Sequence, residues 1–204
     1  MKFLVVFALL AFATESFAQT YGVKAGLNFS NMLMKDDDHT YSDDYEMKPG
    51  FHLGPVAEIP INDLLSFETG LIFSAKGFKY SEDSYDMKLN LFYLDIPLTA
   101  KARYDAGFGN IYGLIGPYLG IGLTGKSVYE DEDEPVDWGS DSDDDDLKRL
   151  DFGLTVGAGV EINSIVVGLS YGLGLANISP DTDGGFKINN RVLGLSVGYW
   201  FGAE

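Results

Sequence analysis

Residues 192–201 read VLGLSVGYWF, and this stretch decides the fold. After Val192, bulky apolar residues occupy every second position, and the positions between them are mostly Gly or Ser. A period of two is typical of a β-strand, whose side chains alternate between two faces. One face here is large and apolar, and the other is small or polar. That pattern indicates a strand of a transmembrane β-barrel, with lipid outside and a packed lumen inside.

The first residues of the chain predict export. Met1-Lys2 is a short positive start, residues 3–13 are apolar, and residues 16–18 (SFA) form a small-x-small cleavage site. This is the organisation of a secretory signal peptide, and the apolar stretch is about half of the roughly 20 residues that a membrane helix needs. We therefore expect a signal peptide over residues 1–18 and a single barrel domain over residues 19–204.

Eight strand candidates follow the same alternation. They are separated by connections that are in turn long and short, as an up-and-down barrel requires when its short turns face the periplasm and its long loops face outward. The sequence therefore predicts an all-β fold, an eight-stranded antiparallel up-and-down transmembrane β-barrel. The candidates cover residues 21–32, 50–61, 64–78, 89–105, 110–125, 149–163, 164–177 and 190–201.

The charge of the chain is concentrated in the expected long loops. The formal net charge is −17, and most of the 31 acidic residues fall within residues 33–49, 79–88, 126–148 and 178–189. We expect these acidic loops to be solvated and self-repelling. A strongly anionic outer face argues against nucleic acid as a partner and favours cations or basic protein surfaces.

Charged residues of the expected strands fall on the inward face. Because eight strands leave a lumen only wide enough for side chains, we expect these groups to form an ion-pair network that closes it. Five acids stand against five bases in this prediction: Glu58, Glu68, Asp95, Asp151 and Glu161, and Lys24, Lys76, Lys101, Arg103 and Arg191.

One acidic run has spacing that suits a metal. Asp141, Asp143 and Asp145 have the Asp-x-Asp-x-Asp spacing of a calcium loop. Asp146 stands where an EF-hand has Gly, and Phe152 stands where it has a bidentate Glu, which excludes an EF-hand. The sequence leaves weak divalent cation binding open there, beside a solvated loop without a metal, and indicates no other cofactor.

Catalytic constellations are scarce. The chain has no Cys, and of its two His residues only His52 lies on an expected inward face. A His-based hydrolase would need His52 beside a serine such as Ser30 or Ser74 on a neighbouring strand. Nothing else marks such a site, so we expect a protein without enzymatic activity.

Five segments carry a resemblance to a known family: residues 21–31 (YGVKAGLNFSN), 93–98 (YLDIPL), 116–120 (GPYLG), 151–161 (DFGLTVGAGVE) and 195–201 (LSVGYWF). They are similar to the porin-like outer membrane β-barrel family that includes PorT-type proteins, with a strand architecture like that of small OmpX-type and OmpW-type barrels. The resemblance implies the outer membrane of a Gram-negative bacterium, contact with its lipid, and insertion by the barrel assembly machinery.

Three functions remain open at this point. The first is a surface or scaffold protein with acidic extracellular loops. The second is a narrow porin-like channel for small solutes or cations. The third, a PorT-like accessory protein of a secretion system, is implied by the resemblance alone.

Overall fold

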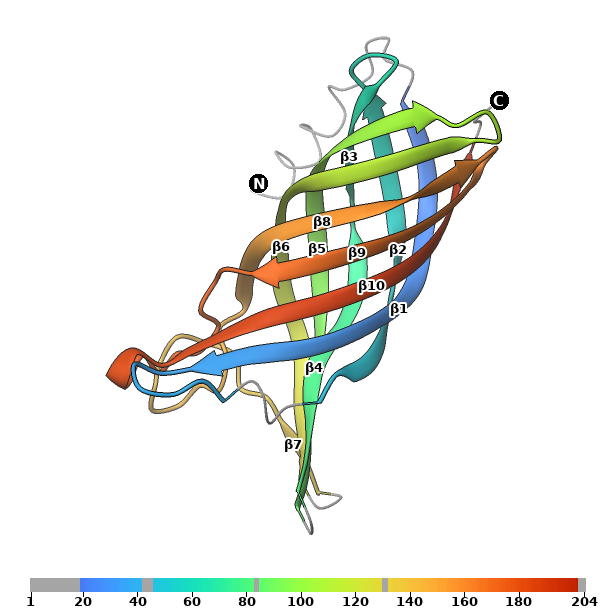
Figure 1. Cartoon of the computed structure of the whole chain (residues 1–204). Coiled ribbons are helices and arrows are strands. Elements are labelled where there is room, and N and C mark those ends of the chain that lie inside the picture. Colours follow the sequence, from blue (N-terminus) through green and yellow to red (C-terminus); the bar gives the residue numbers. More distant parts are fainter. Residues whose placement is uncertain (1–18, 42–45, 83–84, 130–131, 202–204) are drawn as a thin grey trace, which may run out of the picture.

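One antiparallel sheet contains all the strands of the described residues (Figure 1). The computed structural model describes residues 19–41, 46–82, 85–129 and 132–201, so the predicted signal peptide lies outside it. No helix among these residues is long and apolar enough to cross a membrane. The elements are β1 (Thr20–Lys35), β2 (Lys48–Pro60), β3 (Leu65–Gly70), β4 (Ile72–Glu82), β5 (Tyr85–Asp105), β6 (Asn110–Tyr129), β7 (Glu132–Pro135), β8 (Leu150–Ile162), β9 (Ile165–Gly174), the short 3₁₀ helix η1 (Asp183–Gly185) and β10 (Lys187–Phe201).

The sheet closes on itself. β1 pairs with β10 from Tyr21↔Phe201 to Lys35↔Lys187, so neither strand is left as a free edge. β3 and β4 both lie between β2 and β5 and form one wall strand that is interrupted at Leu71. β7 pairs only with β6, beyond the wall. Within the described residues the wall therefore has eight strands, as the sequence predicts.

The two faces of the wall carry the residues that the alternation assigns to them. Leu169 and Leu195 point outward and are 54% and 45% exposed, whereas Lys101 and Asp151 point inward and are fully buried. Apolar side chains exposed on the outer face suit contact with lipid, because lipid tails are apolar as well. The segregation exists because one misplaced charge on the outer face would be costly.

The strands are longer than the sequence pattern predicts. Residues 79–88 are expected to form a loop, but β4 and β5 continue through most of them as a hairpin, and β6 continues to Tyr129 and pairs with β7. β5 has 21 residues, about twice what a bilayer requires. In Figure 1 the hairpin of β4 and β5 and the neighbouring β7 extend well beyond the wall. The acidic residues of this segment predict a loop, but Tyr80 and Met87 are cross-strand partners that pack against the buried apolar side chains, which favours pairing.

Apolar side chains fill the barrel at this extended end. They come from inward positions of β1, β4 and β5 and from the connections 136–149 and 175–186, and we call the set the outer core. Its buried members are Met32, Met34, Phe78, Leu89, Leu91, Tyr93, Val136, Leu147, Ala176 and Ile178. The connection 136–149 is therefore solvated only in part: its few apolar side chains pack inward, while most of its acidic side chains remain exposed.

The connection 136–149 is also tied down by backbone hydrogen bonds. The N–H of Val136 donates to the carbonyl of Gly125 at 3.0 Å, and the N–H of Lys148 donates to the carbonyl of Ile178 at 2.7 Å. Trp138 lies edge-on to Tyr93 with 5.7 Å between ring centres. Gly122 leaves room for the indole, because a Cβ at Gly122 would collide with it.

We predict that Leu147→Asp detaches this connection without opening the wall. Leu147 is 4% exposed, and a carboxylate cannot be accommodated in the outer core without a partner. Trypsin should then cleave after Lys148 and Arg149 roughly tenfold faster or more, because burial of the side chain at position 147 no longer opposes local opening of the connection. Asp144→Asn, in the exposed part of the same connection, is the control and should leave the rate unchanged. Equal rates in both variants would show that the outer core does not hold the connection.

Candidate functional site

The lumen near the short turns contains the more highly charged of two clusters, which we call the turn-end cluster. It consists of Lys24, Glu58, Glu68, Lys101, Arg103 and Glu161. Lys101 lies at its centre, with its Nζ atom 3.0 Å from Glu58 Oε2, 3.5 Å from Glu68 Oε2 and in contact with Glu161. Lys24 pairs with Glu68, and Arg103 pairs with Glu58 and with Glu161. Three positive charges thus meet three negative charges.

Aromatic side chains cover the central ammonium group. Lys101 Nζ lies 4.4 Å from the ring centre of Tyr112 and 5.3 Å from that of Trp200. Both rings are buried on the inward face, and both contribute to a small apolar cluster beside the charges. Cation–π contacts add to the ion pairs, and together the rings and the charged side chains occupy this end of the lumen.

A second cluster, which we call the loop-end cluster, lies nearer the outer core. It consists of Lys76, Tyr93, Asp95, Tyr118, Asp151 and Asn190. Lys76 Nζ is 2.8 Å from Asp95 Oδ1 and 3.3 Å from Asp151 Oδ2. The Tyr118 hydroxyl and the Asn190 amide also donate to Asp151 Oδ2, at 3.2 and 2.9 Å. The rings of Tyr93 and Tyr118 flank Lys76, with centres 4.5 and 4.9 Å from Nζ.

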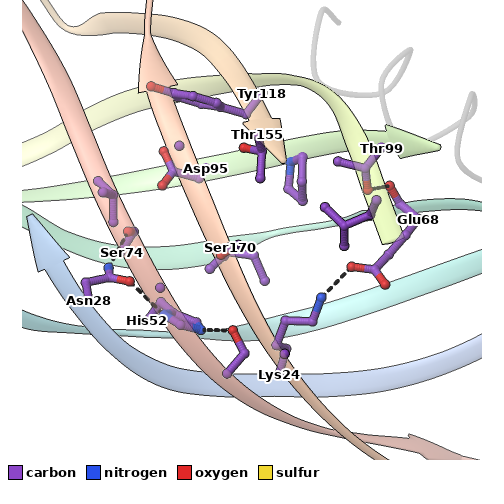
Figure 2. A pocket seen from close by; sticks show the side chains of 18 of the residues that line it. Lys24, Asn28, His52, Glu68, Ser74, Asp95, Thr99, Tyr118, Thr155 and Ser170 are labelled. Atoms are coloured by element: carbon purple, nitrogen blue, oxygen red, sulfur yellow. Dashed lines mark hydrogen bonds and ion pairs between the residues drawn. The ribbon is translucent and has the colours of Figure 1, made fainter. Parts of the chain in front are cut away.

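A cavity of about 140 Å³ separates the two clusters (Figure 2). Lys24 and Glu68 border it on one side, and Lys76 and Asp95 border it on the other. The cavity exists because β9 and β10 present small inward residues to it, whereas the strands opposite present long polar ones. These small residues are Gly168, Ser170, Gly172, Gly194 and Ser196. Its volume corresponds to a few water molecules.

His52 lies on the cavity wall in a defined hydrogen-bond arrangement (Figure 2). Its Nδ1 atom is 2.8 Å from Asn28 Oδ1, and its Nε2 atom is 2.9 Å from Ser196 Oγ. The Asn28 amide nitrogen donates to Ser74 Oγ and to the Ala75 carbonyl, so its oxygen faces the imidazole. His52 therefore donates from Nδ1 and accepts the hydroxyl of Ser196 at Nε2.

This arrangement differs from the hydrolase considered from the sequence. Neither Ser30 nor Ser74 bonds to His52: Ser30 donates to the Lys48 carbonyl, and Ser74 accepts from Asn28. Ser196 takes their place, but it lies in mid-strand, opposite Gly26 on one side and Gly168 on the other. Its backbone N–H is engaged in the sheet and is not available to stabilise an oxyanion.

One of the ten residues predicted to face the lumen lies on the outer face of the wall. Arg191 is paired across the sheet with Leu173, whose side chain is exposed on the outer surface, so Arg191 belongs to that face as well. Its neighbour Asn190 points into the lumen and is 1% exposed. Among the described residues no ion pair involves Arg191. The other nine predicted residues do form ion pairs, so the network has four bases against five acids.

The predicted metal ligands lie in the connection 136–149 but do not converge. Asp145 Oδ2 accepts from the backbone N–H of Asp141 at 2.8 Å, and Asp141 Oδ1 accepts from that of Asp143 at 3.1 Å. In the part of the chain that the structure describes, no group of three or more His, Asp or Glu side chains is placed to hold a metal ion. Weak divalent binding in this connection stays a prediction.

A closed antiparallel barrel with an apolar outer belt and a charged lumen defines the class of outer membrane β-barrel proteins. The family described as "Outer membrane protein beta-barrel domain" matches residues 17–179, and the chain belongs to it. The protein is therefore located in the bacterial outer membrane.

Solved structures of several outer membrane proteins are similar to this chain. Ail, the attachment invasion locus protein of Yersinia pestis, is 18% identical, with 89% of this chain and 98% of that chain covered and a TM-score of 0.42. Neisserial surface protein A is 17% identical, with 89% and 97% covered and a TM-score of 0.48. OprG from Pseudomonas aeruginosa is 14% identical, with 91% and 97% covered and a TM-score of 0.46. No curated protein matches.

Proposed function

We propose that the protein is a closed, non-enzymatic barrel that anchors a folded acidic extension at the cell surface, where it acts as a surface or scaffold protein. One observation carries this proposal: the lumen is filled at three levels, by the turn-end cluster, the loop-end cluster and the outer core. A protein that served transport would need a continuous water path through these levels. Strands that continue beyond the bilayer instead suit the display of a rigid surface.

The chemistry of the displayed surface supports a basic partner. Exposed carboxylates line the outer connections, including Asp37, Asp137, Asp141 and Asp183. Hydrogen bonds lower the pKa of Asp36, first from the Tyr41 hydroxyl and then from the backbone N–H groups of His39 and Asp38. Its charge therefore persists to lower pH than that of an ordinary carboxylate. We propose basic protein surfaces or cations as partners of this face, and not nucleic acid.

The closed barrel predicts an absence of steady conductance. Purified protein in a planar bilayer should give no lasting current steps above background at physiological salt, because both charge clusters would have to part for ions to pass. A trimeric porin in the same bilayer is the positive control. A stable, reproducible open-channel current from the wild-type protein would contradict the proposal and favour the alternative of a narrow channel for small solutes or cations.

The two remaining alternatives rest on different grounds. The channel is favoured by the cavity between the clusters, which already holds room for water. A PorT-like accessory role in secretion rests on the family resemblance alone. Cross-linking in intact cells followed by purification of the barrel would recover defined secretion components if that role is correct, and would recover a surface-exposed partner if the scaffold proposal is correct.

A further inference from the structure

The loop-end cluster has one more negative charge than its positive charge can balance. Lys76 faces both Asp95 and Asp151, and the side chains of Lys76, Asp95 and Asp151 are 3%, 17% and 0% exposed. The turn-end cluster, by contrast, contains equal numbers of acids and bases. A buried carboxylate without compensation is strongly unfavourable, so the loop-end cluster requires another positive charge.

Buried oxygen atoms in the same cluster lack hydrogen-bond partners. The three groups that donate to Asp151 all reach Oδ2, and Oδ1 of Asp151 has no partner among the described residues. Asn190 Oδ1 and the Tyr93 hydroxyl also lack a hydrogen bond of ordinary geometry, and the only polar contact of the Tyr93 hydroxyl among the described residues is with the Asn190 side chain. The side chains of Asp151, Asn190 and Tyr93 are at most 1% exposed. Buried polar atoms of this kind almost always have a partner. A carboxylate, an amide and a phenol oxygen together form a set of hard donors suited to an alkali or alkaline-earth cation.

Other charged groups nearby are already engaged elsewhere. Arg149, two residues from Asp151, donates to the carbonyl of Gly122 at 3.1 Å and stacks on Trp138. Lys24, across the cavity, pairs with Glu68. His52 bonds to an amide and a hydroxyl and makes no ion pair among the described residues. None of these side chains supplies the missing charge.

We propose that the loop-end cluster binds one monovalent cation, Na⁺ or K⁺, through Asp151 Oδ1, Asn190 Oδ1 and the Tyr93 hydroxyl. The charge deficit of one selects a monovalent ion, because a divalent ion would leave the buried cluster positive. The adjoining cavity is lined by Lys76, Asp95 and Tyr118, the other members of the loop-end cluster, so an ion reaches the three ligand atoms from the cavity only past these side chains. The bound ion completes the loop-end cluster as a structural element of the closed lumen.

The proposal is tested by thermal unfolding of the purified protein in detergent at constant ionic strength. NaCl or KCl should raise the Tm in a saturable manner, by about 2–6 °C relative to N-methylglucamine chloride, whose cation is too large for the site. Asp151→Asn removes the excess charge and should abolish the difference between salts. Asp133→Asn removes a carboxylate from the exposed β7 and should retain the difference, which separates site binding from screening of the acidic surface.

A second measurement keeps the test decisive if Asp151→Asn fails to fold. Wild-type crystals soaked in a thallium(I) salt should show an anomalous peak beside Asp151 and Asn190. Equal Tm values in all salts, or thallium confined to the outer surface, would overturn the proposal. A Tm independent of the salt that falls as the pH rises would also overturn it, because a proton held by the cluster would then be the compensating charge and would be lost at higher pH.

Discussion

Replacing Lys101 with Met is expected to lower the free energy of unfolding of the barrel by about 3–5 kcal/mol. Lys101 is fully buried and contacts Glu58, Glu68 and Glu161 at once. Methionine fills a similar volume, so the loss arises mainly from three carboxylates left with two cations at the rim of the cluster. Urea unfolding in lipid vesicles, followed by the fluorescence of Trp200 beside the site, measures it.

Two further variants test whether burial of the ion pair determines the size of the loss in unfolding free energy. Lys126→Met breaks an ion pair with Asp133 in which both side chains are about half exposed, and we expect a change of about 0–1 kcal/mol. Arg103→Ala should fall between the two, because Arg103 is 27% exposed and water can replace part of its contacts. A similar loss for Lys101→Met and Lys126→Met would mean that the turn-end cluster is hydrated and does not close the lumen.

The wall of the barrel could be predicted from the sequence because a local rule determines it. Each residue of a membrane strand faces either lipid or lumen, and lipid tolerates few charges, so the alternation survives in every strand. The same rule finds Lys101 and Asp151 inside. The prediction fails for Arg191, whose charge suggests the lumen but whose position, two residues before the outward-facing Leu193, puts it on the outer face. Parity alone would have identified Asn190 as the inward residue.

The outer core could not be predicted because its contacts are distant in the sequence. Val136, Trp138 and Leu147 are isolated apolar residues in an acidic segment, and no periodicity marks them. Their partners, such as Met32 and Ile178, lie on other strands and in another connection. The cavity is similar in origin, since it depends on small residues of β9 and β10 facing long ones across the lumen. The bond between His52 and Ser196 likewise requires the closure of β1 on β10.

The second large loss of stability is expected from a charge placed in the lipid-facing belt of the barrel. Leu169 is central in β9 and 54% exposed, and its cross-strand partner Leu195 is itself paired with the exposed Leu27. These three leucines form a continuous apolar row across three neighbouring strands of the wall.

Leu169→Arg should therefore lower the free energy of unfolding in vesicles by about 2–4 kcal/mol, because the guanidinium must remain in hydrocarbon or distort the bilayer to reach water. Leu169→Ala shortens the same side chain without a charge and should cost much less, since lipid tails fill the space that the leucine leaves. Ser170→Ala, one residue further along and facing the cavity, should be nearly neutral because water there can reorganise. Reversible unfolding in urea with vesicles of one lipid composition compares the three. Equal losses for Leu169→Arg and Leu169→Ala would mean that this row packs against protein and does not face lipid.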